Sequence, residues 1–338
     1  MANKGKYYES QFEEATIELL REAHWQYTLG DDIHRKYTDP LIEEDLRNFL
    51  AVQYKDKNLT TSEMDGIVAN LRNTGGQNDY YALRNAFLLY RDGYDFAYSD
   101  SRDNPFRMEY IDFEHPDHNI FRCVNQFVMG QGRENRRPDI LLFINGIPVC
   151  IIELKNPTKQ NATIRDAHTQ ICTRYMRDIP ALLKYCALAV ISDGAKNALG
   201  TTYTPFEFFY EWKKIENEDK AGKGLDTLRT LIRGALSPER ILEILRDYVY
   251  FPDPTKEDDT TEIVCRYPQF FATRKLREHI LNHLRSVGGD GKGGTYFGAT
   301  GCGKTYTMLF LARQLVLRCR KQLGSPTILI IVDREDLE

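Results

Sequence analysis

The chain has 338 residues, a formal net charge of −4, 42% hydrophobic residues and 28% charged residues. This composition is typical of a soluble globular protein long enough for two domains, and the chain has no low-complexity tract. The small negative charge gives no general electrostatic reason to bind nucleic acid, so any DNA contact would need local basic patches.

No apolar run is long enough to span a bilayer, and the polar start of the chain does not resemble a signal peptide. We therefore expect a cytoplasmic protein without a membrane partner. The seven cysteines are scattered with no C-x-x-C pair, namely Cys123, Cys150, Cys172, Cys186, Cys265, Cys302 and Cys319. This spacing predicts reduced, mostly buried thiols rather than a zinc site or a disulfide framework.

The first third of the chain is predicted to be mainly helical. Apolar residues at helical spacing predict helices over residues 7–23, 41–50 and 81–90. The pattern then changes to short aromatic and β-branched runs, and a strand is expected over residues 120–129.

A β-hairpin is predicted next, with strands over residues 140–144 and 147–154. They flank Asn145-Gly146, a strong signal for a type I′ turn. A helix is expected over residues 163–176 and a buried strand over 187–192. The order strand, strand, helix, strand predicts a compact mixed α/β core.

Residues 206–250 are predicted to be mostly helical and charged, with a helix that starts at Ser237-Pro238. A proline-rich break at 251–255 marks the expected domain boundary. Beyond it, we expect a strand, a phosphate-binding loop, a helix and a second strand, at residues 294–297, 298–305, 305–317 and 327–332. This order opens a doubly wound α/β domain. The expected parts are residues 1–205, a helical linker at 206–254, and 255–338.

The predicted hairpin carries two carboxylates and a lysine. Glu153 and Lys155 are two residues apart on a strand, so they project from the same face. The tight turn brings Asp139 close to the same end of the sheet. Two carboxylates with a carbonyl and water suit a Mg²⁺ ion, which would polarise a phosphate and lower the pKa of a bound water. Lys155 would then orient that water and offset charge on the phosphate.

An ordinary solvated strand face is the alternative interpretation, because isolated Glu-x-Lys triplets are common. Two features favour the site. Residues 147–154 are otherwise almost wholly apolar, as in a central strand where charged residues are rare. Pro138-Asp139 also precedes the Asn-Gly turn, which completes the pattern PD-x(13)-E-x-K.

This stretch resembles the PD-(D/E)xK nuclease core, and more particularly the amino-terminal domain of the restriction (R) subunit of type I restriction-modification enzymes. The resemblance implies a restriction-endonuclease-like mixed sheet with flanking helices. It implies that Asp139 and Glu153 bind the divalent ion and that Lys155 is catalytic. An early helix of the family carries a further acidic metal ligand, for which Glu13 is the best match. Glu14 and Glu9 are rivals, and an ordinary amphipathic-helix carboxylate is the alternative.

The family also places a Gln-x-x-x-Tyr element on the following helix. Here Gln170 and Tyr175 are one residue further apart. In an α-helix this spacing turns Tyr175 about 140° away from the face of Gln170. We therefore expect Gln170 near the site as a further catalytic residue, and Tyr175 in the core. Three arginines before the site are candidates for phosphate contacts or for a solvated loop, namely Arg133, Arg136 and Arg137.

Residues 298–305 match the Walker A pattern in full. Glycines let backbone N–H groups turn toward the phosphates of ATP, and the helix start adds favourable partial charge. Lys304 would reach the β and γ phosphates, and Thr305 would bind Mg²⁺. The expected nucleotide-binding residues of the loop are Gly298, Gly301, Gly303, Lys304 and Thr305.

Residues 266–271 resemble the adenine-recognition element of superfamily 2 helicases. Gln269 would hydrogen-bond the adenine edge, and a loop with core aromatics is the alternative. Residues 331–337 resemble the strand-to-loop motif after the first motor helix of type I R subunits. Together these matches imply the beginning of a RecA-like motor domain.

No Walker B acid pair, second motor lobe or arginine finger follows the phosphate loop. We therefore expect an amino-terminal fragment of a longer protein, with weak or absent ATP hydrolysis. The resemblance implies ATP-driven translocation on double-stranded DNA, endonuclease activity, and assembly with methylation (M) and specificity (S) subunits. The alternatives are a stand-alone ATP-dependent helicase-nuclease of repair or defence, and a degenerate nuclease fold that serves as an interaction module.

Overall fold

The structure is a computed structural model of the 338-residue chain, and it describes residues 2–100, 103–130, 135–155, 163–216, 222–252 and 260–331. Its contacts divide the chain into two compact units, Met1–Val264 and Cys265–Glu338. The predicted boundaries at 205/206 and 254/255 stay predictions. No helix of the described residues is long and apolar enough to cross a membrane.

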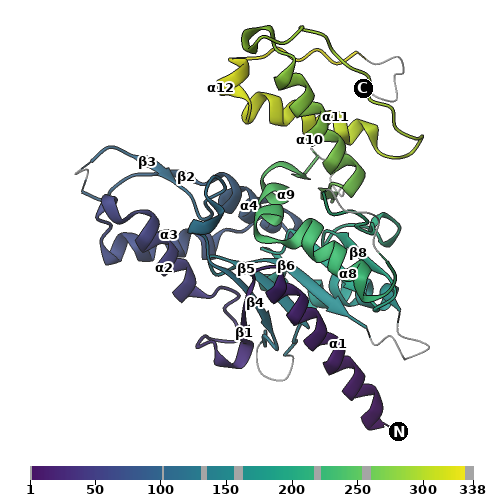
Figure 1. Ribbon diagram of the computed structural model, residues 1–338. Coiled ribbons are helices and arrows are strands. Elements are labelled where there is room, and N and C mark those ends of the chain that lie inside the picture. The colour runs from purple at the N-terminus through teal and green to yellow at the C-terminus, as the bar shows by residue number, and fades with distance from the viewer. Residues whose placement is uncertain are drawn as a thin grey trace. The chain divides into compact units, whose positions relative to one another are not determined.

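A six-stranded mixed sheet forms the centre of the first unit (Figure 1). Its strands, in spatial order, are β1 (Gln26–Leu29), β4 (Phe121–Asn125), β5 (Ile140–Ile144), β6 (Ile147–Leu154), β7 (Leu188–Ser192) and β8 (Asn197–Gly200). β1 is parallel to β4 and β6 is parallel to β7, while the other neighbours are antiparallel. The predicted mixed α/β core is confirmed.

The predicted hairpin has the expected bounds. Every residue of β5 and β6 is buried, as the apolar run requires for central strands. Asn145 and Gly146 both have positive φ, 50° and 77°, which is the type I′ turn that the Asn-Gly pair predicts. A Cβ on Gly146 would collide with the carbonyl oxygen of Ile42, so the position requires glycine for two reasons.

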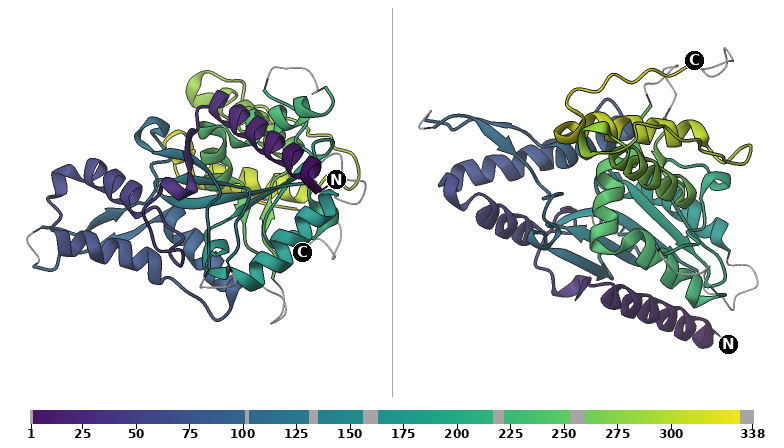
Figure 2. Two further views of the ribbon diagram at one scale, coloured as in Figure 1. Left: turned by 90° about the horizontal axis from the view of Figure 1, so that it is seen from below. Right: turned by 45° about the horizontal axis from the view of Figure 1, so that its top comes forward.

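Helices cover both faces of the sheet. Figure 2 shows α1 (Ala2–Glu22) on one side and the segment that begins with α5 (Ile164–Thr169) on the other. The latter continues through the π-helical η5 (Gln170–Tyr175), α6 (Met176–Asp178) and α7 (Pro180–Leu183), and forms the crossover between β6 and β7. Apolar side chains of α5 and η5 belong to the core cluster that also contains Ile151 and Phe143.

Three further helices lie between β1 and β4 in the sequence: α2 (Glu43–Gln53), α3 (Thr61–Asn73) and α4 (Asp79–Asp92). α2 and α4 correspond to predicted helices, whereas α3 was not predicted. Its hydrophobic pattern is interrupted by Gly66, although Thr60 and Glu63 form a capping box that announces the start of a helix.

The rest of the first unit consists of short elements. Two small hairpins pair β2 (Tyr94–Phe96) with β3 (Phe106–Met108), and β9 (Val249–Tyr250) with β10 (Ile263–Val264). The predicted helical segment contains α8 (Leu225–Leu231), the π-helical η7 (Ile232–Leu236) and α9 (Pro238–Asp247). Short 3-10 turns are η1 (Gly30–Asp32), η2 (Lys55–Lys57), η3 (Pro116–His118) and η6 (Phe206–Phe208). As predicted, a helix starts at Ser237-Pro238, with Ser237 at the N-cap position, although its hydroxyl donates to the Arg233 carbonyl and not to the helix.

The second unit contains α10 (Tyr267–Asn282), η8 (Arg285–Val287), α11 (Lys304–Leu317) and α12 (Arg320–Leu323). α11 confirms the helix predicted after the phosphate loop. The two predicted strands are wrong over their described residues, 294–297 and 327–331, which form no strand. A strand needs a partner for its backbone N–H and C=O groups, and these segments pair with no other described segment. Phe297 and Leu329 are accordingly 91% and 81% exposed.

Some sequence-based expectations fall outside the described residues. Arg133 lies in the undescribed range 131–134. The motif at 331–337 is described only at its first residue. The proline-rich break at 251–255 is described only up to Pro252.

Candidate active site

The end of β6 places three predicted site residues together. Glu153 and Lys155 share the β6 face that also carries Ile151, the face covered by α5 and η5. The backbone N–H of Lys155 donates to the Ser192 carbonyl at 2.7 Å, so the strand pairing with β7 continues to the lysine. Asp139, just before β5, accepts a 2.7 Å hydrogen bond from the Leu154 N–H. The antiparallel pairing therefore fixes both carboxylates at one end of the sheet.

Lys155 connects the carboxylates to the following helix. Its Nζ donates to Oε1 of Glu153 and to Oε1 of Gln170, both at 2.7 Å. The lysine side chain is only 14% exposed and Glu153 is 1% exposed, so this contact is largely shielded from solvent.

Burial and charge shift the titration of Glu153. Burial, and to a smaller extent the nearby Asp139, raise the pKa of its carboxyl to about 8, although Lys155 acts in the opposite direction. A carboxyl with this environment favours its neutral form until a cation joins the site. Strongly raised carboxyl pKa values are characteristic of functional sites.

A π-helical turn corrects the expectation for Tyr175. Residues 170–175 form i→i+5 hydrogen bonds in place of the α-helical pattern, and the side chains of Gln170 and Tyr175 therefore meet. Gln170 Nε2 donates to the Tyr175 hydroxyl at 2.6 Å, and that hydroxyl donates to the Arg137 carbonyl at 3.4 Å. The extra residue between Gln170 and Tyr175 is absorbed by the π turn. Tyr175 is both a core residue and a member of the site.

The carboxylates fit a hard divalent cation. Oε2 of Glu153 is buried and has no hydrogen-bond partner among the described residues. Such a buried acceptor is costly unless a cation or proton satisfies it. Asp139 is half-buried beside it and supplies the second carboxylate. Oxygen ligands from one or two carboxylates, completed by water and substrate oxygens, are what Mg²⁺ prefers.

Glu13 lies near the same end of the sheet. Its Oε1 accepts hydrogen bonds from Asn125 Nδ2 at 2.7 Å and Gln126 Nε2 at 2.9 Å. Asn125 ends β4 and pairs with Ile140, the residue after Asp139. The described acidic groups do not bring Glu13, Asp139 and Glu153 into one cluster with ligand atoms within 4.8 Å. Its rival Glu14 is exposed on α1, and the side chain of Glu9 is not described.

The two amides that hold Glu13 were missed by sequence reasoning. Asn125 and Gln126 directly follow the apolar end of β4, and Gln126 adopts a positive φ of 56°. The sequence did contain a signal for these residues, namely two adjacent polar residues at the end of a buried strand.

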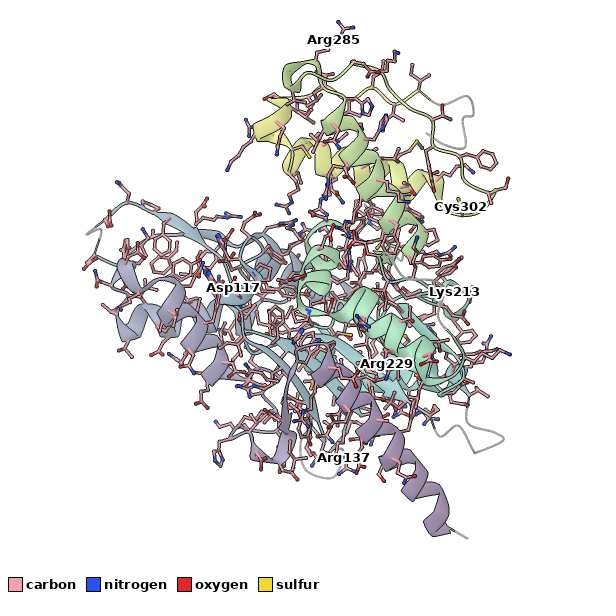
Figure 3. All side chains as sticks on the ribbon, in the orientation of Figure 1. Asp117, Arg137, Lys213, Arg229, Arg285 and Cys302 are labelled. Carbon is pink, nitrogen blue, oxygen red and sulfur yellow. The ribbon has the colours of Figure 1, made fainter. Side chains whose placement is uncertain are left out.

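The described arginines before the site differ in their contacts. Arg136 Nε donates to Asp178 at 2.7 Å and is thereby paired within the protein. The side chain of Arg137, labelled in Figure 3, is exposed. Of these two, Arg137 is the better placed to meet a phosphate of DNA.

The phosphate loop of the second unit is formed at the start of α11. Gly301 and Gly303 have positive φ, 76° and 78°, and α11 begins at Lys304 and continues through Thr305. Lys304 Nζ donates to the carbonyl oxygens of Gly298 at 2.9 Å and Ala299 at 3.1 Å. The lysine side chain thus lies over the loop that is predicted to bind the phosphates of ATP.

Gln269 contacts the loop rather than open solvent. Its Oε1 accepts from the Arg266 N–H at 2.7 Å and its Nε2 donates to the Gly303 carbonyl at 3.1 Å. The side chain is 3% exposed. A Cβ on Gly303 would collide with Gln269, so close approach is a second reason for this glycine. In this arrangement the Gln269 amide joins the start of α10 to the phosphate loop.

A mixed sheet with an Asp, Glu and Lys cluster at one strand end defines the class of PD-(D/E)xK nucleases. Comparison with known proteins is more specific. Residues 6–208 match the family described as "Type I restriction enzyme R protein N terminus", and residues 268–338 match the family "SWI2/SNF2 ATPase". Because the first match covers more than half of the chain, the chain belongs to the type I restriction enzyme R protein family.

Curated relatives agree with this assignment. The chain is 29% identical over 342 residues to the "Type I restriction enzyme HindI endonuclease subunit" of Haemophilus influenzae, with 98% of this chain and 32% of the relative covered. It is 27% identical over 352 residues to the "Putative type I restriction enzyme MjaIXP endonuclease subunit" of Methanocaldococcus jannaschii, covering 96% and 33%. The chain thus spans about a third of the length of these relatives.

Proposed function

We propose that the first unit is a Mg²⁺-dependent DNA endonuclease and that the chain belongs to the restriction subunit of a cytoplasmic type I complex that acts against unmodified foreign DNA. The single observation that carries this proposal is the contact of Lys155 with Glu153 and Gln170 beside Asp139. The family membership and the endonuclease names of the relatives support the same activity.

Asp139 and Glu153 would hold the ion. When bound there, Mg²⁺ supplies polarisation of the scissile phosphate and a more acidic water. Glu153 offers its unpartnered Oε2, and its raised pKa means that it gives up a proton as the ion binds. Glu13, whose Oε1 accepts two amide hydrogen bonds, would add negative charge near the ion at this end of the sheet.

Lys155 is the catalytic cation. Its ammonium would orient the attacking water and stabilise negative charge on the phosphate. Gln170 holds the lysine by its carbonyl oxygen, and Tyr175 holds Gln170 by its hydroxyl. This chain of hydrogen bonds positions the lysine without adding another charge.

The test is cleavage of double-stranded DNA by the full-length assembly with Mg²⁺ and ATP. Asp139→Ala, Glu153→Ala and Lys155→Ala are each expected to lower cleavage by about 10²-fold or more while ATP turnover continues. Glu14→Ala, on the exposed side of α1, is the matched control and should cleave normally. Unchanged cleavage by all three site variants would contradict the assignment.

For the second unit we propose ATP binding at residues 298–305, as part of an ATP-driven translocase in the longer protein. The support is the formed loop at the start of α11 and the match to an ATPase family. Titration with a fluorescent ATP analogue should show binding to the chain with little turnover, at least about tenfold weaker binding by Lys304→Ala, and normal binding by Lys292→Ala. Equal binding by all three proteins would contradict the proposal.

The proposed partners are double-stranded DNA and the M and S subunits. The relatives are named endonuclease subunits, which supports a multi-subunit complex. Co-purification of the full-length protein with a methyltransferase and a specificity subunit would support this assembly. Recovery of an active enzyme without them would favour the stand-alone helicase-nuclease.

A further inference from the structure

A second cluster of ligating side chains lies in the loop before β4. Oδ2 of Asp112 accepts from Nδ1 of His115 at 3.3 Å and from Nδ1 of His118 at 2.9 Å. The ligand atoms of all three residues lie within 4.8 Å of one another, and no other cluster in the described part of the chain meets this criterion. Nothing in the proposed nuclease or ATP-binding function uses these residues.

The aspartate is held in place by its own loop. Its Oδ1 accepts from the backbone N–H of Glu114 at 3.0 Å and of His115 at 2.9 Å, which fixes a tight turn. Gln53 Nε2 donates to Oδ2 at 3.1 Å from α2. The Asp112 side chain is only 7% exposed, so it is an oriented, buried carboxylate rather than a solvated one.

Hydrogen bonds from two asparagines hold both ends of the loop in place. Asn119 accepts from the Asp112 N–H at 2.9 Å and donates to the Asp112 carbonyl at 2.7 Å. Asn145, in the turn between β5 and β6, donates to Asn119 Oδ1 at 2.8 Å and to the Tyr110 carbonyl at 3.0 Å. Asn145 is fully buried. The loop is therefore fixed to the rigid central hairpin, as a preformed ligand site requires.

The spacing of the ligand atoms fits metal coordination. Ligands bound tetrahedrally at zinc bond lengths lie about 3.3 Å apart. The two observed N···O distances, 3.3 and 2.9 Å, are close to this value. Each imidazole offers a lone pair at Nδ1 when its proton is on Nε2, so a metal ion would take the position that the two N–H···O hydrogen bonds now span.

The surroundings favour a site that is open on one side. His115 and His118 are 63% and 49% exposed, and their rings are stacked with centroids 4.8 Å apart. His115 precedes the η3 turn and His118 ends it; the turn includes Asp117, labelled in Figure 3. Three protein ligands and a solvent-facing side leave a coordination position for water or an external group.

We propose that Asp112, His115 and His118 bind a late first-row divalent transition metal ion such as Zn²⁺. Two imidazoles and one carboxylate suit Zn²⁺ and its neighbours better than Mg²⁺, which prefers oxygen ligands alone. The site is separate from the nuclease centre. The ligand loop leads into the start of β4, whereas Asn125 at the end of β4 contacts Glu13.

Calorimetric titration of the full chain with Zn²⁺ tests this proposal, with excess Mg²⁺ present to occupy oxygen-rich sites. We expect one equivalent of Zn²⁺ bound by the parent chain. The double variant His115→Gln, His118→Gln should lose that equivalent or bind it at least about 100-fold more weakly. Glutamine can still donate a hydrogen bond to Asp112 but is a poor ligand for Zn²⁺, so the loop should stay folded.

A second histidine pair supplies the matched control. His279 lies in the last turn of α10 and His283 directly follows the helix, with ring centroids 3.9 Å apart. The variant His279→Gln, His283→Gln should keep the equivalent of Zn²⁺. Loss of Zn²⁺ in this control, or equal affinity in both double variants and the parent, would overturn the proposal.

Folding is checked by circular dichroism and by the thermal shift that Zn²⁺ produces. If the double variant is unfolded, the single variant His118→Gln replaces it in the thermal-shift experiment. Zn²⁺ that binds the folded state raises the melting temperature. A Zn²⁺-dependent rise in the parent that is lost in His118→Gln supports the site. The same rise in both proteins overturns it.

Discussion

The nuclease centre and the phosphate loop differ in what holds their functional side chains. Asp139, Glu153 and Lys155 are fixed by strand pairing on both sides of β6 and by the helix over that face. Lys304 instead contacts the carbonyl groups of its own loop. A paired central strand positions side chains through many backbone hydrogen bonds, whereas a glycine-rich loop relies on contacts within a few residues. The following predictions test this difference.

The largest effect is expected from Lys155→Ala. Loss of the ammonium removes charge stabilisation from the reacting phosphate, so cleavage should fall by about 10²–10³-fold. Binding of the divalent ion should persist, because both carboxylates remain. DNA cleavage and metal binding by the same purified variant check the two statements. A variant that keeps full cleavage would show that Lys155 is only an ion-pair partner of Glu153.

The hairpin turn should be the next most sensitive position. Gly146→Ala forces alanine into a positive φ and against the Ile42 carbonyl, and we expect it to lower the unfolding free energy by about 1–3 kcal/mol. Gly66→Ala in α3 is the matched control. Its Cβ meets nothing within 4 Å, and alanine should stabilise the helix by roughly 0.5–1 kcal/mol. Urea unfolding measures the free energy of unfolding of both variants. Equal changes in the two variants would contradict the claim that the hairpin turn requires glycine.

A moderate pH effect should follow from Glu153. Its pKa is raised from 4.5 to about 8, mainly by burial and then by Asp139. Below pH 4.5 the carboxyl is protonated in both states. Between about pH 4.5 and 8 the unfolded chain has released the proton and the folded chain keeps it, so metal-free stability should fall as pH rises. Glu153→Gln should reduce this fall in urea unfolding, and an unchanged slope would contradict the assigned environment.

The smallest effect is expected from deletion of Thr173, an exposed residue within the π turn. The deletion would restore α-helical spacing between Gln170 and Tyr175, since residues four apart share a helix face. Cleavage should stay within about threefold of the parent, because the lysine keeps its Gln170 partner. A loss as large as that of Lys155→Ala would show that the π turn itself is required.

Much of the nuclease half could be predicted because its signals are local. The Asn-Gly turn and the two apolar runs gave the bounds of β5 and β6, and period two placed Glu153 and Lys155 on one face. Other contacts of the site could not be predicted in this way. No local pattern indicates that a π turn brings Tyr175 to Gln170, nor that Asn125 and Gln126 hold Glu13.

Around the phosphate loop, local features were predicted correctly but the pairing of strands was not. The Walker A pattern correctly located the start of α11, because glycine spacing and a helix start are local features. The strands at 294–297 and 327–332 were predicted from the sequence around the phosphate loop, which does not show whether a partner strand is present. Exposed Phe297 and Leu329 are the result in the described part of the second unit.

The central claim is that Asp139 and Glu153 bind a divalent ion, and direct titration with Mn²⁺ in place of Mg²⁺, followed by electron paramagnetic resonance, tests it. The account predicts that Asp139→Asn and Glu153→Gln each lose one bound equivalent of Mn²⁺, whereas Glu14→Gln on the exposed face of α1 keeps it. Undiminished Mn²⁺ binding by both site variants would contradict the account.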